Sequence, residues 1–200
     1  MRRKNETTKD GRLSPTALAD CLPTMSTWAD RPLRTAALVF FDLETTALRP
    51  DRGGRICEMA VVDQRGVRFD WRSDEDPPRD DAVAAQLPVL IDHLEAGMVV
   101  GHNLQFDFRF LTYEAERLGC GGVDLRVADT LGLARTLLDA PNDHQLGTLL
   151  CHFDAAPDEE LHTAVGDALA TRALFWHLVE HGGLSTLADV GVQRLQWSAG

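Results

Sequence analysis

The sequence predicts a single α/β domain in which a mixed β-sheet is flanked by helices. The chain has 200 residues, of which 44% are apolar, and a chain of this size can bury the core of one domain without disulfides. From residue 36 onward, short apolar runs alternate with segments of helical periodicity. Three strands come first and strand and helix then alternate, which indicates both antiparallel and parallel pairing in one sheet.

The elements follow from these patterns in chain order. Residues 37–43 form an apolar run typical of a central strand, and 56–63 and 66–71 are strands joined by a turn at 63–66. The further elements are a helix at 81–95, a strand at 98–101, a helix at 106–118, a strand at 125–128 and helices at 130–138, 146–153 and 162–181.

The ends of the chain differ from its middle. Residues 1–35 carry seven Lys or Arg against four acids, a net +3, and show little apolar periodicity. We expect this segment to be a flexible N-terminal extension, with one short helix at 16–22 and Met25 as a candidate natural start. Residues 36–183 are expected to form the folded domain, and 184–200 a short C-terminal tail.

Composition and charge exclude several classes of protein. The net charge of -11 argues against a protein that holds duplex nucleic acid by a broad basic face. The four cysteines are scattered without a CxxC pair, so neither a disulfide framework nor a structural zinc site is indicated. No apolar run approaches the ~20 residues of a membrane span, and the polar start is unlike a signal peptide. We therefore expect a cytoplasmic protein without a membrane partner.

Two acids stand at the end of the first strand. Asp42 and Glu44 are two residues apart and so point to the same face of a strand. Like charges at the end of a buried strand repel and lose hydration, at a cost of several kcal/mol per ion unless a cation compensates. A metal ion explains the pair economically. The alternative is that both acids lie in a solvated loop or cap a helix.

A second group of polar residues follows the apolar strand at 98–101. It has the sequence His-Asn-Leu-Gln-Phe-Asp over residues 102–107, at the kind of strand-to-helix junction where open α/β sheets place their sites. Asn103 is a natural helix cap and Phe106 a natural core residue. Asp107 is harder to explain structurally, because its neighbours make the helix apolar on most sides.

A third group opens the last long helix. Ala164, Gly166 and Ala168 are small and let this helix approach the sheet closely. Asp167 can then lie near Asp42, with His162 at the start of the helix. The alternative for Asp167 is a first-turn acid stabilised by the helix dipole.

Taken in this order, the segments resemble the motifs of the DnaQ-like family of exonucleases with a DEDDh active site. That family includes the proofreading epsilon subunit of bacterial DNA polymerase III, RNase T and oligoribonuclease. The similarity covers residues 36–182 and lies in Asp-Leu-Glu-Thr-Thr (42–46), His-Asn-x-x-Phe-Asp (102–107), Asp-Thr (129–130) and His-x-Ala-x-x-Asp (162–167). It implies a ribonuclease H-like fold with a five-stranded mixed sheet.

The resemblance also implies an activity. A protein of this family removes terminal nucleotides in the 3′-to-5′ direction as nucleoside 5′-monophosphates. We expect it to act on single-stranded or frayed nucleic-acid 3′ ends, with DNA preferred. The alternatives are an exoribonuclease of the oligoribonuclease or RNase T type and a non-catalytic module that binds nucleic-acid ends or a protein.

Carried onto this chain, the resemblance assigns roles to individual residues. The catalytic acids are expected to hold two Mg²⁺ or Mn²⁺ ions, with Asp42 shared, Glu44 and Asp167 completing one site and Asp107 serving the other. His162 is expected to accept the proton of the attacking water. The residues expected to contact the terminal nucleotide are Thr45, His102, Asn103 and Phe106.

The chain also departs from the family pattern. Ala47 replaces the Gly that commonly follows Glu-Thr-Thr, and residues 72–81 are acidic where the family often has a His-Gly-Ile-like motif. The short expected tail is unlike the long polymerase-binding tail of a proofreading subunit. We therefore expect a nuclease that stands alone or has a different protein partner.

Overall fold

The computed structural model describes residues 28–155 and 161–197. The expectations for residues 1–27, including a helix at 16–22 and a start at Met25, lie outside the described residues. No described helix combines the length and apolarity that crossing a bilayer requires.

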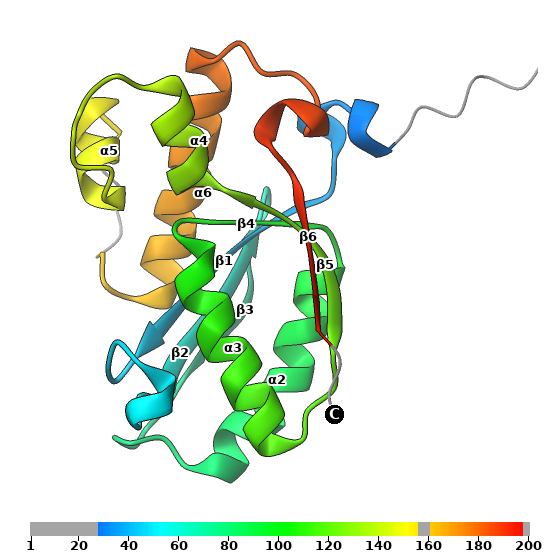
Figure 1. Ribbon diagram of the computed structural model, residues 1–200, viewed down its shortest axis with the longest axis vertical. Coiled ribbons are helices and arrows are strands. Elements are labelled where there is room, and N and C mark those ends of the chain that lie inside the picture. The colour runs from blue at the N-terminus through cyan, green and yellow to red at the C-terminus, as the bar shows by residue number, and fades with distance from the viewer. Residues whose placement is uncertain (1–27, 156–160, 198–200) are drawn as a thin grey trace, which may run out of the picture.

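A six-stranded mixed sheet forms the centre of the molecule (Figure 1), and its order is β3-β2-β1-β4-β5-β6. The strands are β1 (Leu38–Thr45), β2 (Ile56–Asp63), β3 (Gly66–Arg72), β4 (Met98–Gly101), β5 (Val123–Asp129) and β6 (Gln193–Trp197). β1 pairs antiparallel with β2 and parallel with β4. β1 therefore lies inside the sheet, as its apolar sequence predicts.

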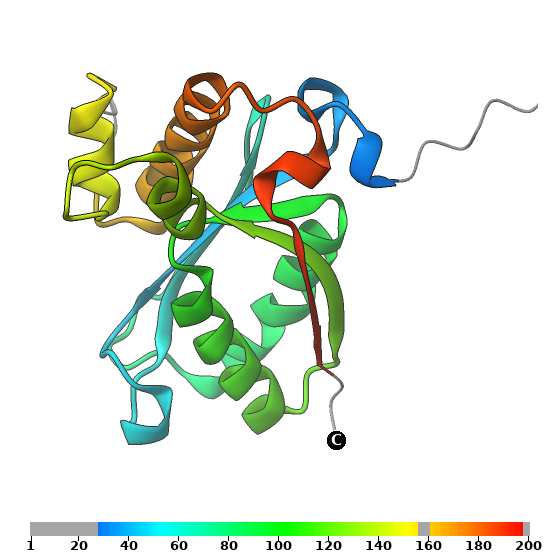
Figure 2. The same cartoon turned by 45° about the horizontal axis from the view of Figure 1, so that its top comes forward.

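The helices cover both faces of the sheet (Figure 2). They are α2 (Asp80–Glu95), α3 (Leu104–Leu118), α4 (Thr130–Leu137), α5 (Leu146–His152) and α6 (Ala164–His181). Phe41 of β1 packs on the side of α2 and α3, where its ring stacks on Phe108. Phe40 packs on the other side, against Phe175 of α6. Successive residues of β1 thus enter two different cores, as the two-residue period of a strand requires.

The predicted α/β class is confirmed, and the sheet has one strand more than the five expected. The sixth strand, β6, pairs antiparallel with β5 and lies in the segment that the sequence places in a short tail. Only Leu195 and Trp197 of β6 pack against the core. A five-residue strand with two apolar side chains gives too short a pattern to separate from a loop.

The described part of the expected N-terminal extension packs on the domain. Residues 28–35 form two 3₁₀ turns, Trp28–Asp30 and Leu33–Thr35, and Leu33 is buried. The Leu33 N–H donates to the carbonyl of Ser185 at 2.9 Å, so this segment meets the one that leads to β6. The division of the chain into extension, domain and tail stays a prediction.

Candidate active site

Three carboxylates meet at the end of β1. Asp42, Glu44 and Asp167 each offer an oxygen, and these oxygens all lie within 4.8 Å of one another. All three side chains are partly exposed, so the cluster is open to solvent and to ions. This group matches the pair and the helix acid that the sequence predicts to converge.

The alternation of β1 explains why the cluster faces α6. Phe40 packs against α6, and Asp42 and Glu44 follow it at intervals of two on the same face. Ala164 and Ala168 of α6 are fully buried against this face. Their small side chains bring the first turn of α6 close to the sheet, as predicted, and Asp167 comes with it.

Asp107 approaches the same place from α3. Its side chain is only 4% exposed, and its Oδ1 accepts a hydrogen bond from the Leu43 N–H at 3.2 Å. The charge of Asp107 is the largest neighbouring influence on the pKa of Asp42. The structure therefore places the fourth predicted acid beside the other three.

The electrostatics of these acids call for a cation. Burial and the charges of Asp107 and Asp167 raise the pKa of Asp42 well above its usual value, and burial likewise raises the pKa of Asp107. The pKa of Glu44 is raised by burial and by Asp167. None of the ion pairs among the described residues involves the four acids. Oxygen donors with unbalanced charge suit Mg²⁺ or Mn²⁺, so the donor set fits a divalent ion.

His162 lies at the entrance of the site. It is exposed and has a φ of 71°, a left-handed conformation that is uncommon outside glycine. Its backbone N–H donates to Asp167 Oδ1 at 3.2 Å. The helix expected from residue 162 begins instead at Ala164, because this turn and the capping residue Thr163 precede it.

The residues predicted to contact a nucleotide lie around the start of α3. Phe106 is half-buried, with its ring 5.1 Å from that of Phe110. Asn103 is exposed and donates its backbone N–H to Asp129 Oδ1 at 2.8 Å. Thr45 ends β1 and is partly exposed, so these side chains are accessible to a ligand.

His102 differs from the other three because both of its ring nitrogens are engaged within the protein. Nδ1 lies 2.9 Å from the Thr130 hydroxyl, and Nε2 lies 3.0 Å from the carbonyl of His144, to which its N–H can donate. Burial lowers the pKa of this imidazole. These contacts tie the segment before α5 to the start of α3.

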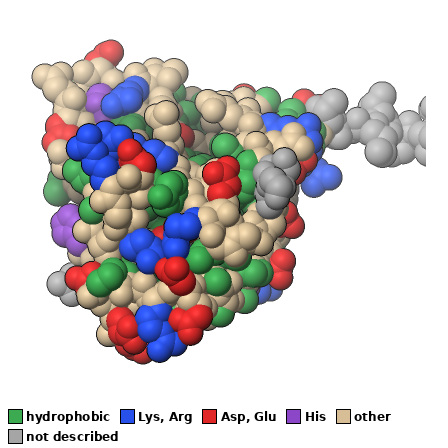
Figure 3. Space-filling view, turned by 60° about the horizontal axis from the view of Figure 1, so that its bottom comes forward, with side chains coloured by type: hydrophobic (Ala, Val, Ile, Leu, Met, Phe, Trp, Pro, Cys, Tyr) green, Lys and Arg blue, Asp and Glu red, His purple; other side chains and the backbone are tan. Residues whose placement is uncertain are grey.

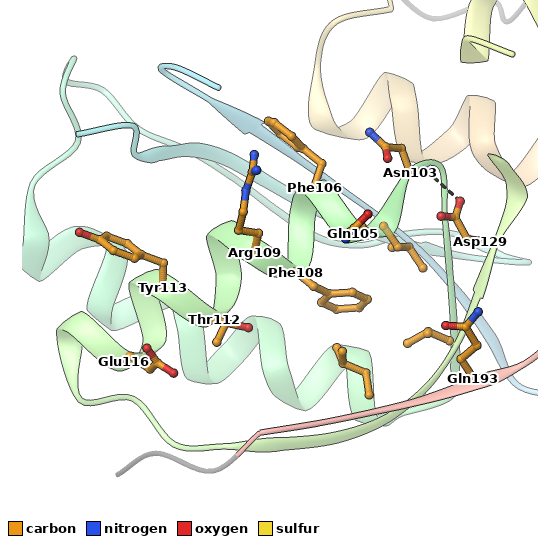
Figure 4. Close-up of a pocket in the computed structure, with 13 residues that line it drawn as sticks. Asn103, Gln105, Phe106, Phe108, Arg109, Thr112, Tyr113, Glu116, Asp129 and Gln193 are labelled. Atoms are coloured by element: carbon orange, nitrogen blue, oxygen red, sulfur yellow. Dashed lines mark hydrogen bonds between the residues drawn. The ribbon is translucent and has the colours of Figure 1, made fainter. Parts of the chain in front are cut away.

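A groove of about 1100 Å³ lies beside these residues, between α3 and the strands β5 and β6. In Figure 4, Phe108 and Gln193 face its interior, and the Asn103–Asp129 hydrogen bond lies near one end. None of the four clustered acids lines the groove. The groove therefore includes the predicted nucleotide contacts Asn103 and Phe106 but not the acids.

One nearby acid escaped the sequence predictions. Glu58 of β2 stands directly opposite Glu44 in the strand pair, and its Oε2 accepts a hydrogen bond from the Ala164 N–H at 3.2 Å. The sequence feature that could have identified Glu58 is its spacing, because Glu58 shares a strand face with the buried residues Ala60 and Val62. An acid in that register is unusual for a central strand.

Fold and site together define a class: α/β proteins with a carboxylate cluster for divalent ions at the end of a central strand. No family model matches the chain. It is 31% identical over 186 residues, covering 80% of the chain, to the PolC-type DNA polymerase III of Oceanobacillus iheyensis. It is 30% identical over 192 residues, covering 82% of the chain, to a DNA polymerase III subunit epsilon-like protein of Rhodobacter capsulatus.

The structure is similar to that of exonuclease X in complex with 5′ overhanging duplex DNA. The TM-score is 0.51 at 21% identity, over 76% of this chain and 98% of the other. The chain belongs to the DnaQ-like 3′–5′ exonuclease family. It spans only 13% of the length of the Oceanobacillus relative and 27% of the Rhodobacter relative.

Proposed function

We propose that this protein is a metal-dependent 3′–5′ exonuclease that releases nucleoside 5′-monophosphates from single-stranded or frayed nucleic-acid ends, with DNA preferred. The observation that carries the proposal is the convergence of Asp42, Glu44 and Asp167 within 4.8 Å, beside a buried Asp107. Family membership supports the same activity.

The four acids have distinct positions for holding ions. The charges of Asp107, Asp167 and Glu44 all act on Asp42, so Asp42 is suited to bind two Mg²⁺ or Mn²⁺ ions at once. Glu44 and Asp167 would complete one ion's ligands and Asp107 would serve the other. Ions bound there would supply positive charge to offset the negative charge that develops on the phosphodiester in the transition state.

His162 is the proposed general base. Its imidazole would accept a proton from the attacking water on a ring nitrogen, a role that histidine side chains often fill in general-base catalysis. The hydrogen bond from the His162 backbone N–H to Asp167 fixes the backbone position of His162. The base is thereby held beside the acids while its side chain stays exposed.

Thr45, Asn103 and Phe106 would bind the terminal nucleotide, with Thr45 meeting the 3′-hydroxyl. Both ring nitrogens of His102 are engaged within the protein. We therefore assign His102 to the wall of the nucleotide-binding pocket formed with these residues, rather than to a polar contact with the nucleotide. Figure 3 shows basic and acidic side chains interspersed on the face in view. Such a surface suits a short substrate segment near its end rather than a long phosphate track.

The DNA preference and the cellular location rest on the relatives. Two of them are named as DNA polymerase III proteins, which favours a DNA substrate and a cytoplasmic location.

The direct test uses 5′-labelled DNA and RNA oligonucleotides of one sequence, with Mg²⁺ or Mn²⁺. We expect a descending ladder and released mononucleotides, with DNA cut faster. Asp42→Ala and Asp167→Ala should abolish release, and His162→Ala should lower turnover more than metal affinity. Asp124→Ala, at an exposed acid of β5, is the matched control and should keep full activity.

Each alternative has its own result in this assay. A clear preference for RNA would make the protein an exoribonuclease. Binding of 3′ ends without release of mononucleotides would make it a non-catalytic module. Activity that survived Asp42→Ala or a chelator would contradict the metal mechanism.

A further inference from the structure

Glu58 lies next to the acid cluster without belonging to it. It pairs with Glu44 across β2 and β1, so both side chains point toward α6. The Glu58 side chain is 12% exposed. Its carboxylate lies outside the group of three converging acids, and it forms an ion pair with Arg72, whereas none of the four proposed metal ligands forms one among the described residues.

The two oxygens of Glu58 contact different elements. Oε2 accepts the N–H of Ala164, the first residue of α6, at 3.2 Å. Oε1 lies 3.2 Å from Arg72 Nε on β3. The first amides of a helix lack partners within the helix, and a carboxylate is favoured there by the helix dipole. Glu58 thereby links α6 to the sheet at the residue where α6 begins.

The segment held in this way carries two functional residues. His162 adopts a left-handed backbone conformation, which a non-glycine residue keeps only where surrounding contacts hold it. Two carboxylates supply such contacts: Asp167 binds the His162 N–H, and Glu58 binds the Ala164 N–H. The first contact lies within the segment, while the second ties the segment to the sheet.

We propose that Glu58 is a positioning residue, which anchors the start of α6 so that His162 and Asp167 are held against Asp42 and Glu44. The expected effect of Glu58 on kcat rests on the proposed nuclease function. Its expected effect on the start of α6 rests on geometry alone. The contact requires an acceptor oxygen on a side chain of this length. A negative charge is not needed for it, and glutamine offers a similar oxygen.

The kinetic test compares Glu58→Gln with Glu58→Ala under saturating Mg²⁺. We expect Glu58→Ala to lower kcat about tenfold with little change in KM, and Glu58→Gln to stay within about threefold of the wild type. In a His162→Ala background, Glu58→Ala should lower kcat by clearly less than tenfold, because the part of its effect that acts through His162 is already lost. Arg72→Gln, which removes only the exposed partner of Glu58, should change kcat little.

The structural test uses amide hydrogen exchange by NMR on the full chain without nucleic acid. We expect faster exchange at residues 162–167 in Glu58→Ala and near wild-type exchange in Glu58→Gln, while α4 exchanges equally in all three proteins. Thermal unfolding confirms that each variant is folded.

Three results would overturn the proposal. One is an unchanged kcat in Glu58→Ala, and another is unchanged exchange at the start of α6. The third is that Glu58→Gln loses as much kcat as Glu58→Ala and also binds Mg²⁺ more weakly. That result would make Glu58 a metal ligand. If the wild type releases no mononucleotides, the proposed function fails, and the exchange experiment still decides whether Glu58 anchors α6.

Discussion

Asp42 is the residue on which the charges of the site act together. Burial raises its pKa most, followed by the charges of Asp107, Asp167, Glu44 and Glu58. The spacing of Asp42 and Glu44 predicts that they share a face, which the structure confirms. Without a cation, the repulsion among these charges lowers the stability of the folded state. When a cation is present, the same charges bind it.

We predict that Asp42→Asn unfolds at a higher temperature than the wild type in a chelator, because it removes a repelled charge at nearly constant shape. In Mg²⁺ the order should reverse, since the wild type gains free energy from binding an ion to the native state. For a chain of this size, ~1 kcal/mol corresponds to roughly 2–4 °C. Calorimetry in both conditions measures the effect. An Asp42→Asn variant less stable than the wild type in chelator would contradict this account.

Among the elements, the loop between β1 and β2 positions the end of β1. Thr46 donates its N–H to the carbonyl of Arg55 at 2.9 Å, and Arg109 of α3 donates to the carbonyl of Leu48 at 2.7 Å. Gly54 closes the loop, and a Cβ there would lie 2.7 Å from the carbonyl oxygen of Arg49. The loop therefore has contacts with α3 and no room for a side chain at residue 54.

We predict that Gly54→Ala lowers the free energy of unfolding by about 1–3 kcal/mol, because backbone has to move. Gly132→Ala in α4 is the matched control, since a Cβ there meets nothing within 4 Å. It should be stabilising by roughly 0.5–1 kcal/mol through helix propensity. Urea unfolding measures both variants, and equal effects would show that the close contact at residue 54 relaxes freely.

In the molecule as a whole, an ion network around the buried Glu114 joins the two helices of one face to the sheet. The Glu114 side chain on α3 is fully buried and pairs with Arg55, just before β2, and with Arg117. Both arginines also reach Asp80 on α2. Removing one cation would leave part of a buried charge without compensation.

We predict that Arg55→Met lowers the free energy of unfolding by about 3 kcal/mol, the lower end of the range for breaking a buried pair, because Arg117 remains. Arg194→Met breaks an exposed pair with Asp124 on the sheet edge and should have little effect. Denaturant unfolding compares the two. A small loss for Arg55→Met would show that the remaining cation suffices.

The stability of the whole protein should also depend on pH when metal is removed. The pKa values of Asp42, Glu44, Asp107 and Asp167 are raised in the folded state, with burial the main cause. From about pH 4, the usual carboxyl value, up through these raised values, the native state holds more protons than the unfolded state. Stability should therefore fall as the pH rises through that window.

Urea unfolding at several pH values in a chelator measures this dependence. Mg²⁺ should reduce this loss of stability with rising pH, because ion binding to the native state becomes stronger as the acids ionise. A rise in stability across the window without metal would contradict the raised pKa values.

Much of the fold could be predicted because its elements have strong local patterns. The apolar run before Asp42 predicts a central strand, and the turn before residue 66 predicts the β2–β3 hairpin. Strand β6 and the late start of α6 could not be predicted. β6 is held mainly by its pairing with β5, and the His162 turn by its backbone hydrogen bond to Asp167.

The four acids and His162 could be predicted as site residues from residue type, spacing and resemblance to a family, since these are properties of the chain. Their distances, the engagement of His102 and the contact of Glu58 with α6 were not. Glu58 and Ala164 lie 106 positions apart in the chain, and no local pattern encodes a contact between a strand and a helix so distant. Such a contact exists only once both have packed on the same face of the sheet.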